Sequence, residues 1–515
     1  MAIKIFMLIV FFSVMIGIGL YCRRHSTDVN GFVLGGRSVG PWLTAFAYGT
    51  SYFSAVIFVG YAGQFGWKYG IAATWAGLGN AFLGSLLAWV VLGRRTRIMT
   101  QHLDSATMPD FFGKRFNSSS LRIAASVITF IFLIPYTASL YNGLSRIFKM
   151  AFNIDYSVCV IVMAILTGIY VIAGGYMATA INDFVQGCVM LVVIVAVIVA
   201  VLGSRGGFFA AYEGMALVAD SSVTEVPGMF ASFFGPDPVG LLGVVLLTSL
   251  GTWGLPQMVQ KFYAIKSEKS ISTGTIVSTC FAVIVAGGCY FLGGFGRLFT
   301  TPEDVAANGF DSIVPTMLSG LPDILIALVI ILVLSASMST LSSLVLTSSS
   351  TLTLDLIKGT FVKDMDEKKQ VFIMRMLLIV FIVISVILAI IQYRSSVTFI
   401  AQLMGVSWGA LAGAFLAPFL YGLYWKGTST AACWVSFLFS SVVMVANIFV
   451  RANFPALLQS PINCGAFCMI AGLVIVPVIS VFTKKPDKAL VEDAFSSYDE
   501  KVLVRKSQSL EGESD

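Results

Sequence analysis

Hydroxyl side chains gather in the middle of one long apolar run, residues 321–355. Ser339 and Thr340 are followed by Ser342 and Ser343, so a helix would place several hydroxyls on one face. Hydroxyl and carbonyl oxygens without a full carboxylate suit a weakly held, hard monovalent cation such as sodium. Serines in a membrane helix also bond to their own preceding carbonyls and allow close packing. The pattern by itself leaves both interpretations open.

Asp183 is the most informative acidic residue, because it stands at the start of the apolar run 181–203. A carboxylate at membrane depth is costly and usually serves a function such as cation binding. Alternatively, Asp183 is an N-terminal carboxylate that the helix dipole favours at the cytoplasmic boundary. The residue alone does not decide between these two roles.

Two other apolar runs are interrupted near their middle by residues that loosen a helix. Residues 49–51 (Gly-Thr-Ser) interrupt the run 40–66, and residues 251–256 (Gly-Thr-Trp-Gly-Leu-Pro) interrupt the run 239–261. Paired interruptions at matching places in two halves are typical of transporter binding sites. Either one alone is equally typical of a kink or a small-residue packing seam. Because five spans separate the pair, we predict two inverted five-helix repeats.

The elements that must position these residues are membrane helices. The chain has 515 residues, of which 57% are hydrophobic and 11% charged, with a net charge of +6. This composition excludes a soluble multidomain enzyme, a disordered chain and a nucleic-acid binder. Eight cysteines without a CxxC pair and only two histidines argue against a disulfide framework, a zinc site or a haem. A bilayer core of about 30 Å needs roughly 20 apolar residues per helix.

On this criterion the sequence predicts an all-α membrane protein with thirteen transmembrane helices. The predicted spans are 4–22, 40–66, 70–93, 120–148, 156–178, 181–203, 239–261, 271–296, 321–355, 371–393, 396–425, 429–450 and 462–483. The predicted divisions are an N-terminal helix and first loop (1–38), a first repeat (39–203), an extracellular loop (204–238), a second repeat (239–427), two final helices (428–483) and a tail (484–515). We expect the polar tail to be disordered.

Basic residues set the predicted orientation. If the N-terminus is outside, 24 of the 32 Lys and Arg residues fall on the cytoplasmic side, among them Arg37, Arg97, Arg115 and Lys261. Such an excess of Lys and Arg marks cytoplasmic segments. The sequence therefore predicts an external N-terminus and a cytoplasmic C-terminus.

Four stretches resemble the sodium:solute symporter family, which includes proline, pantothenate and sodium/glucose carriers. They are residues 32–41 (FVLGGRSVGP), 107–116 (TMPDFFGKRF), 170–186 and 336–341 (ASMSTL), and the resemblance covers roughly residues 5–450. It implies a LeuT-type fold, with ten core helices in two inverted repeats of five, one extra helix before them and two after. It also implies a main sodium site formed by carbonyls of Thr50, Phe53 and Ala336 with hydroxyls of Ser339 and Thr340. Some members bind a second sodium, for which Asp183, Ser342 and Ser343 are the matching residues here.

The resemblance also bears on the solute. Sugar carriers have Asn-Gln after the Trp-Gly of the seventh span, whereas this chain has Leu255-Pro256-Gln257. Proline carriers have an aspartate at one position of the second span. This chain has Tyr52 at that position, as pantothenate-type carriers do. The first feature resembles the pantothenate and proline branch and counts against a sugar, and the second resembles pantothenate-type carriers. The expected solute-site residues are Ser54, Tyr136, Tyr141, Thr252, Trp253, Gln257 and Trp408.

The sequence thus indicates a sodium-coupled symporter in the cell membrane rather than an enzyme. Its expected partners are the lipid bilayer, co-transported Na⁺ and a small organic solute, with no nucleic acid. We expect a carboxylate such as pantothenate, proline or a short monocarboxylate, moved by alternating access. The alternatives are a proton-coupled carrier of the same fold, with Asp183 as the titrating group, and a sodium/sugar-type symporter.

Overall fold

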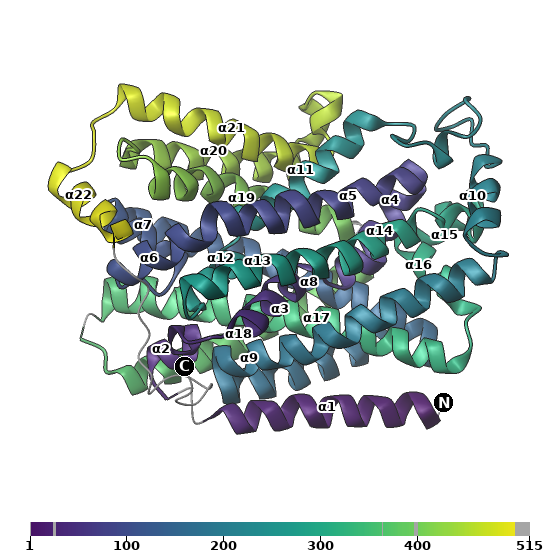
Figure 1. Ribbon diagram of the computed structural model, residues 1–515, viewed down its shortest axis with the longest axis horizontal. Helices are drawn as coiled ribbons and strands as arrows, with labels where there is room; N and C mark the ends of the chain where they lie inside the picture. The colour runs from purple at the N-terminus through teal and green to yellow at the C-terminus, as the bar shows by residue number, and fades with distance from the viewer. Residues whose placement is uncertain (1, 24–26, 363, 396–399, 500–515) are drawn as a thin grey trace.

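The apolar runs fold into helices that lie side by side along the long axis of the molecule (Figure 1). The computed structural model describes residues 2–23, 27–362, 364–395 and 400–499. Five of the 24 Lys and Arg residues predicted on the cytoplasmic side lie outside the described residues, namely Arg24, Lys363, Lys501, Arg505 and Lys506. Within the described residues the structure is helical apart from two isolated β-bridges, Val39 with Ile265 and Asp220 with Thr224.

The first 203 residues contain nine of the labelled α-helices. They are α1 (Ala2–Cys22), α2 (Val29–Leu34), α3 (Pro41–Tyr52), α4 (Ala62–Tyr69), α5 (Thr74–Gly79), α6 (Arg94–His102), α7 (Met108–Arg115), α8 (Ser119–Phe152) and α9 (Tyr156–Gly203). Short 3₁₀ and π segments join them: η2 (Gly35–Arg37), η3 (Val56–Tyr61), η4 (Gly70–Ala73), η5 (Asn80–Leu87) and η6 (Trp89–Gly93).

The remaining helices follow after Gly203. They are α10 (Phe208–Ala216), α11 (Pro238–Gly254), α12 (Pro256–Ala264), α13 (Glu268–Ala282), α14 (Gly288–Gly293), α15 (Pro302–Asn308), α16 (Ile313–Ser319), α17 (Asp323–Thr351), α18 (Glu367–Ser395), α19 (Ile400–Tyr424), α20 (Thr430–Phe449), α21 (Pro461–Phe482) and α22 (Lys488–Ser496). The short segments are η7 (Met229–Ala231), η8 (Val283–Gly287), η9 (Gly296–Leu298), η10 (Phe310–Ser312), η11 (Leu352–Phe361), η12 (Arg451–Asn453), η13 (Ala456–Leu458) and η14 (Ser497–Asp499).

Ten helical stretches of the described residues are long and apolar enough to cross a membrane, or eleven if the bent pair α11 and α12 is one span. Two of these stretches, Val56–His102 and Tyr156–Gly203, have 47 and 48 residues. A straight helix of 48 residues would measure about 72 Å, more than twice a bilayer core. Gly70 (φ 61°, ψ −143°) and Gly175 (φ 56°, ψ −146°) interrupt them in a conformation that favours glycine. The all-helical membrane architecture is confirmed, while the count of thirteen stays a prediction.

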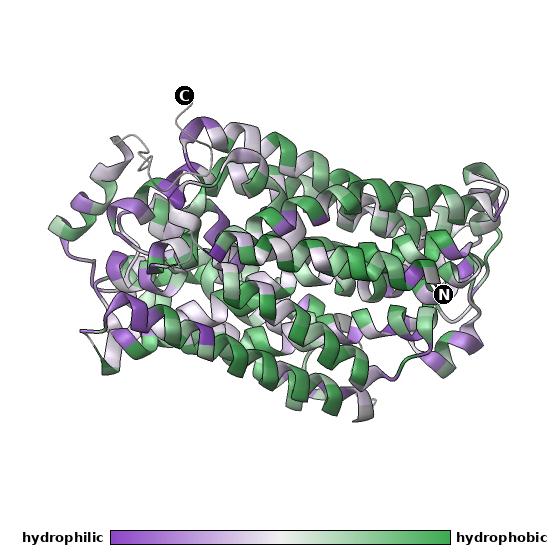
Figure 2. Ribbon diagram, turned by 90° about the horizontal axis from the view of Figure 1, so that it is seen from below, coloured by the Kyte–Doolittle hydropathy of each residue, from purple (hydrophilic) through white to green (hydrophobic). Residues whose placement is uncertain are grey.

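Helix α17 lies at the centre of the bundle. In the most apolar part of the stretch Asp323–Phe361, 83% of the residues are buried. Helix α17 packs against α9, α8, α18 and α3. Helix α1 packs against α9 and α17 from outside, and the Lys4 ammonium pairs with Asp323 at the start of α17, at 2.9 Å. Figure 2 shows hydrophilic residues gathered at the two ends of the bundle, most densely at the end away from the N-terminus. The serine-rich helix is therefore enclosed by the others, in the place a transport site requires.

Several arginines that set the predicted orientation are buried and tie together connectors at one end of the bundle. Arg37 donates to the Ser105 carbonyl at 2.6 Å, and Arg97 donates to the Ile265 carbonyl at 2.6 Å. Arg115 donates to the Gly422 carbonyl at 2.9 Å. Because each guanidinium satisfies backbone carbonyls of another segment, these charges hold the loops in place.

The C-terminal tail corrects one expectation. Instead of being disordered, α22 and η14 dock on the ends of α6, α7 and α19 (Figure 1). The Tyr498 hydroxyl donates to the Leu423 carbonyl at 2.6 Å, and the Arg115 guanidinium lies 5.1 Å from the Phe495 ring centre. The sequence criterion failed because two aromatic residues of the tail find cations and backbone carbonyls that only the fold brings near.

Candidate functional site

The two predicted interruptions have nearly identical backbones. Helix α3 ends at Tyr52, and Phe53 is extended (φ −80°, ψ 119°) before the chain turns helical again. Helix α11 ends at Gly254, and Leu255 is extended (φ −82°, ψ 122°) before α12 begins. The last carbonyls of α3 and α11 and the first amides of the following helices lose their intrahelical partners. Both breaks therefore expose main-chain dipoles inside the bundle.

The first break meets the hydroxyls of α17. The Ser339 hydroxyl donates to the Thr50 carbonyl at 3.0 Å and to the Ala336 carbonyl at 3.1 Å. The Thr340 hydroxyl lies 3.3 Å from the carbonyl oxygens of both Thr50 and Phe53, and 3.1 Å from that of Ala336. All five predicted sodium ligands thus come together, which we call the α3–α17 cage.

The chemistry of the α3–α17 cage fits a hard cation. It contains five neutral oxygens, three carbonyls and two hydroxyls, and all five residues are completely buried. A hydroxyl that donates to a carbonyl can rotate its hydrogen away and present a lone pair instead. Neutral oxygen donors suit a weakly held, hard monovalent ion such as Na⁺.

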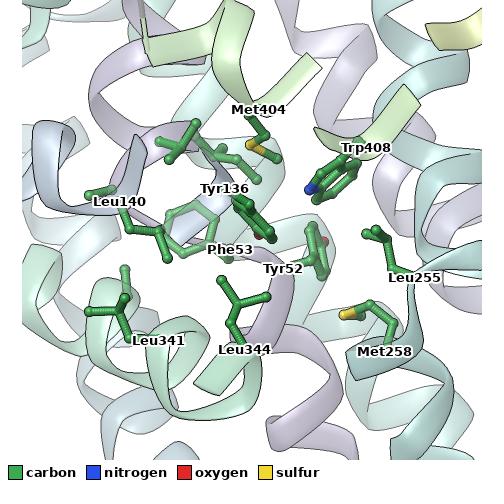
Figure 3. Close-up of a cluster of buried hydrophobic side chains, with 14 of the residues drawn as sticks. Tyr52, Phe53, Tyr136, Leu140, Leu255, Met258, Leu341, Leu344, Met404 and Trp408 are labelled. Carbon is green, nitrogen blue, oxygen red and sulfur yellow. The ribbon is translucent and has the colours of Figure 1, made fainter. Parts of the chain in front are cut away.

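Beside the cage lies a cluster of large side chains from five helices and both breaks (Figure 3). We call this set the solute cluster: Tyr52, Phe53, Tyr136, Leu140, Leu255, Met258, Leu341, Leu344, Met404 and Trp408. The rings of Tyr136 and Trp408 meet edge to face, with their centres 5.9 Å apart. Phe53 belongs to both sites, since its side chain lies in the cluster and its carbonyl in the cage. The two sites therefore share the extended residue of the first break.

Few polar groups accompany the solute cluster. The Tyr136 hydroxyl is close to the side chains of Ser54 and Trp408. Gln257, between Leu255 and Met258 at the second break, is buried, and neither atom of its amide has a hydrogen-bond partner among the described residues. A buried amide without partners is unfavourable and indicates a place where a ligand can bind. Ser54, Tyr136, Gln257 and Trp408, four of the residues predicted for the solute site, thus lie in or beside this cluster.

Three other predicted solute-site residues lie elsewhere. The Thr252 hydroxyl donates to the Gly84 carbonyl at 2.8 Å, and the Trp253 indole donates to the Leu83 carbonyl at 2.9 Å. Both side chains therefore face η5. Tyr141 is buried on α8, but five residues after Tyr136 it points about 140° away around the helix. These three predictions are corrected, because the rotation of each helix about its axis turns these side chains away from the solute cluster.

The sequence analysis missed the apolar members of the cluster. Leu140 and Met404 lie four residues from Tyr136 and Trp408, on the same helix faces. Leu255 and Met258 immediately flank Gln257. Helical spacing from the predicted aromatic residues could have identified the first two, but nothing in the sequence distinguishes them from ordinary core residues.

The residues predicted for a second sodium surround a lysine. The Lys261 ammonium, on α12, lies 3.8 Å from an Asp183 carboxylate oxygen and 3.0 Å from the Ser343 hydroxyl. Ser342 does not join them, because its hydroxyl donates to the Ser339 carbonyl of its own helix at 2.9 Å. Lys261 is only 1% exposed, so its ammonium lies inside the bundle rather than in solvent. A lysine stem reaches from the end of α12 back into the bundle.

A separate cavity of about 870 Å³ opens at the end that holds the outer loops. Arg146 and Asp311 face each other across it at 4.0 Å. Nearby, Arg297 pairs with Asp220 at 2.8 Å. Partial burial acts to raise the pKa of Asp220, but hydrogen bonds from Ser222 and Arg297 and the Arg297 charge outweigh it, holding the pKa below its usual value. The pair joins the loop that contains Asp220 to η9 beside this cavity.

Known proteins match the chain over most of its length. The model of the sodium:solute symporter family matches residues 32–438. The osmoregulated proline transporter OpuE of Bacillus subtilis is 29% identical over 514 residues, covering 96% of this chain and 98% of the relative. A sodium/proline symporter of Staphylococcus aureus is 28% identical over 495 residues and covers 93% of both chains.

Solved structures match the fold. A Na⁺-coupled sialic acid symporter in a substrate-bound, outward-open state aligns with a TM-score of 0.72 and 15% identity, covering 94% of this chain and 99% of the other. Mhp1, a transporter of the nucleobase-cation-symport-1 family, aligns with a TM-score of 0.50 and 14% identity, covering 91% and 98%. These identities are too low to transfer a ligand, and the matches concern the fold alone.

Proposed function

Because the chain belongs to the sodium:solute symporter family, we propose that the solute it carries with sodium is proline or a close zwitterionic analogue. The chain is a multi-pass protein of the cell membrane, it is a transporter rather than an enzyme, and Na⁺ is its co-transported ion. The proposals below concern the solute, the residues that bind each cargo and the detailed topology.

The α3–α17 cage is the proposed main sodium site. The single observation that carries it is the convergence of Ser339 and Thr340 on the carbonyls of Thr50 and Phe53 at 3.0–3.3 Å. Sodium bound there would join α3 to α17. The ion would replace the donated hydroxyl hydrogens as the positive partner of the carbonyls.

The solute cluster is the proposed proline site. Its ten side chains are apolar or aromatic and uncharged, which suits a small saturated ring packed against this group of side chains. The zwitterion then needs main-chain partners. The amide end of α12 at the second break favours the carboxylate, and the carbonyl ends of α3 and α11 favour the amine. The names of the two relatives, a proline transporter and a sodium/proline symporter, support this choice.

The proposed topology keeps thirteen spans, with the N-terminus outside and the tail in the cytoplasm. Gly70 and Gly175 each separate two spans within one long helical stretch. The matching conformations of Phe53 and Leu255 support two inverted five-helix repeats, 39–203 and 239–427. The outer loop 204–238 joins them, and the segments 1–38, 428–483 and 484–515 lie outside the repeats.

Alternating access follows from this arrangement. Sodium entering from outside fixes the first break against α17, and the shared residue Phe53 couples the cage to the solute cluster. By linkage, each ligand raises the affinity for the other by the same factor. Inward movement of one sodium charge gains about 2.3 kcal/mol per 100 mV of membrane potential. Separation of α3 from α17 would then release both cargoes.

Uptake into proteoliposomes tests the proposal. Labelled proline should accumulate with an inward sodium gradient and not when choline replaces sodium. Ser339→Ala should weaken sodium dependence. The matched control is Ser350→Ala, whose hydroxyl donates only within α17, to the Thr347 carbonyl at 3.1 Å. Equal sodium dependence in both variants would contradict the cage assignment.

Competing solutes and ions are separated in the same assay. Uptake of pantothenate, a short monocarboxylate or a sugar in preference to proline would replace the solute assignment. Uptake driven by a proton gradient without sodium would support the proton-coupled alternative. The uncharged, largely apolar lining of the solute cluster disfavours a sugar, whose hydroxyls need many polar partners.

A further inference from the structure

Lys261 is a buried cation that the sodium-coupled cycle described above does not use. Its side chain is 1% exposed, in a bundle whose charged residues lie mostly at the two ends. An ammonium group in such a place persists only when it is paired, since removing it from water is unfavourable. The groups that surround the Lys261 ammonium therefore indicate which kind of ligand this part of the bundle can bind.

Three other helices supply the groups around the ammonium. Asp183 and Tyr176 come from α9, with the Tyr176 ring centre 5.0 Å from the Lys261 nitrogen. Ser343 comes from α17 and accepts a hydrogen bond at 3.0 Å. The Ser343 hydroxyl is 2.9 Å from that of Ser51 on α3. A carboxylate, two hydroxyls and an aromatic face make a site for one positive charge.

This site continues the α3–α17 cage by one helical turn. Ser343 follows Ser339 by four residues on α17, and Ser51 follows Thr50 directly on α3. One turn corresponds to about 5–6 Å along the helix. Lys261 likewise follows Gln257 by four residues on one face of α12. The seam between α3 and α17 thus has two positions for cations, one in the cage and one filled by a side chain.

Asp183 retains capacity for another partner. It is completely buried, and neither carboxylate oxygen accepts a hydrogen bond from a described residue, while the Lys261 ammonium lies 3.8 Å away. Without that ammonium, Asp183 would be an uncompensated buried charge beside two hydroxyls. A small hard cation is the partner that such oxygens would attract.

We propose that the Lys261 ammonium is a tethered cation in the place of a second sodium ion, so that the native protein binds one sodium. Removing the lysine side chain then opens a second sodium site formed by Asp183, Ser343 and Ser51. This inference rests on the proposed function only for the identity of the first site. In this proposal, Lys261 determines how many sodium ions are transported with each solute molecule.

Equilibrium binding of ²²Na⁺ to the purified full-length protein, without any solute, tests this proposal. The wild type should bind about one sodium per protein and Lys261→Ala about two, because the second site loses its competitor. Lys261→Arg keeps the charge and should still bind one. The double variant Lys261→Ala with Asp183→Asn removes both charges and should return to one.

The cage variant identifies which sodium is lost. Ser339→Ala should reduce strong sodium binding to none in the wild-type background and to one in the Lys261→Ala background. If Ser339→Ala changes neither count, the proposed main site fails while the role of Lys261 is still decided by the other variants. In proline uptake, the Hill coefficient for sodium should rise from about one to about two in Lys261→Ala.

Two results would overturn the proposal. Two sodium ions bound by the wild type would show that the ammonium does not exclude a second ion, and this measurement needs no variant to fold. One sodium bound by a monodisperse Lys261→Ala protein would show that no second site opens. If Lys261→Ala does not fold, Lys261→Ser, which removes the same ammonium group, takes its place and should also bind about two sodium ions.

Discussion

The two helix breaks have the same backbone but different surroundings. Phe53 and Leu255 differ by only 2–3° in φ and ψ. The carbonyls before Ser54 face the hydroxyls of Ser339 and Thr340, whereas the second break is flanked by Leu255, Gln257 and Met258 next to aromatic rings. A break supplies unpaired dipoles, and in the proposed function the helix that packs across it determines whether an ion or an organic solute binds.

A second difference concerns close packing. Gly49 precedes the first break and faces Phe281 of α13, while Gly251 precedes the second and faces Trp408. A methyl group at either glycine would come within 2.5 Å of the ring. The first contact is structural, because Phe281 packs on Phe46 with ring centres 5.5 Å apart. The second touches the solute cluster directly. The following predictions test this division between the two breaks.

The largest effect is expected at the first break. Thr340→Val keeps the shape of the side chain and removes a hydroxyl from the cage. Losing a ligand of a charged group corresponds to about 1.5–3 kcal/mol, or about 10- to 100-fold weaker sodium affinity. The sodium concentration for half-maximal uptake measures it. Thr353→Val, whose hydroxyl donates only to the Ser349 carbonyl of the same helical segment at 2.9 Å, is the control. An unchanged sodium affinity in Thr340→Val would remove the distinction between the breaks.

A somewhat smaller effect is expected from overpacking at the second break. Gly251→Ala pushes against Trp408, and such overpacking typically has an effect of about 1–3 kcal/mol. We expect the KM for proline to rise roughly tenfold. Gly49→Ala should instead lower the melting temperature and leave the KM for proline unchanged. If both alanine variants raise that KM equally, the two breaks do not divide the cargoes.

Gln257→Leu should have a moderate effect limited to the solute. It removes the buried amide, for which a neutral hydrogen bond contributes about 1 kcal/mol, or roughly fivefold in the KM for proline. The sodium concentration for half-maximal uptake at saturating proline should not change. A shift in sodium dependence with an unchanged KM for proline would mean that Gln257 contributes to sodium binding rather than to solute binding.

The smallest effect is expected far from both breaks, at the Asp220–Arg297 pair. Since the pKa of Asp220 in the folded protein is below its ordinary value, the pair stabilises the fold above about pH 4 and loses this contribution as the pH falls through the lowered pKa. At pH 7, Asp220→Asn should lower the melting temperature by roughly 1–2 °C, and near pH 2 the two proteins should be equal.

Neither sodium affinity nor the KM for proline should respond to Asp220→Asn at pH 7. A change in either would mean that the outer loop takes part in cargo binding. A difference in melting temperature that persists unchanged at low pH would show that the ion pair is not its source.

Local sequence features were good guides where the decisive property is local. Glycine, proline and hydroxyl residues interrupted the runs at 49–51 and 251–256, and the structure breaks its helices at Phe53 and Leu255. The hydroxyl face of residues 339–340 could be predicted from helical spacing and lies in the cage. The family resemblance predicted which residues of another helix meet that face. Spacing within one helix cannot predict this contact.

Contacts between helices were harder to predict. Thr252 and Trp253 stand beside the second break in the chain, yet they face η5, because the orientation of α11 is set by Gly251 and Gly254 packing on α19. The buried position of Lys261 was not predicted, since hydropathy cannot show that a long side chain turns back into the bundle. The docked tail was missed for the same reason, as its aromatic residues depend on partners distant in sequence.

The sequence by itself determined a helical membrane protein of the sodium:solute symporter family and the two positions where its helices open. These are consequences of hydropathy, helix-breaking residues and motifs, all of which act over a few neighbouring residues. Only the tertiary structure decided which side chains face each break, and that an ammonium group fills the position below the cage. Those outcomes depend on how each helix is rotated and packed, and therefore on many contacts at once.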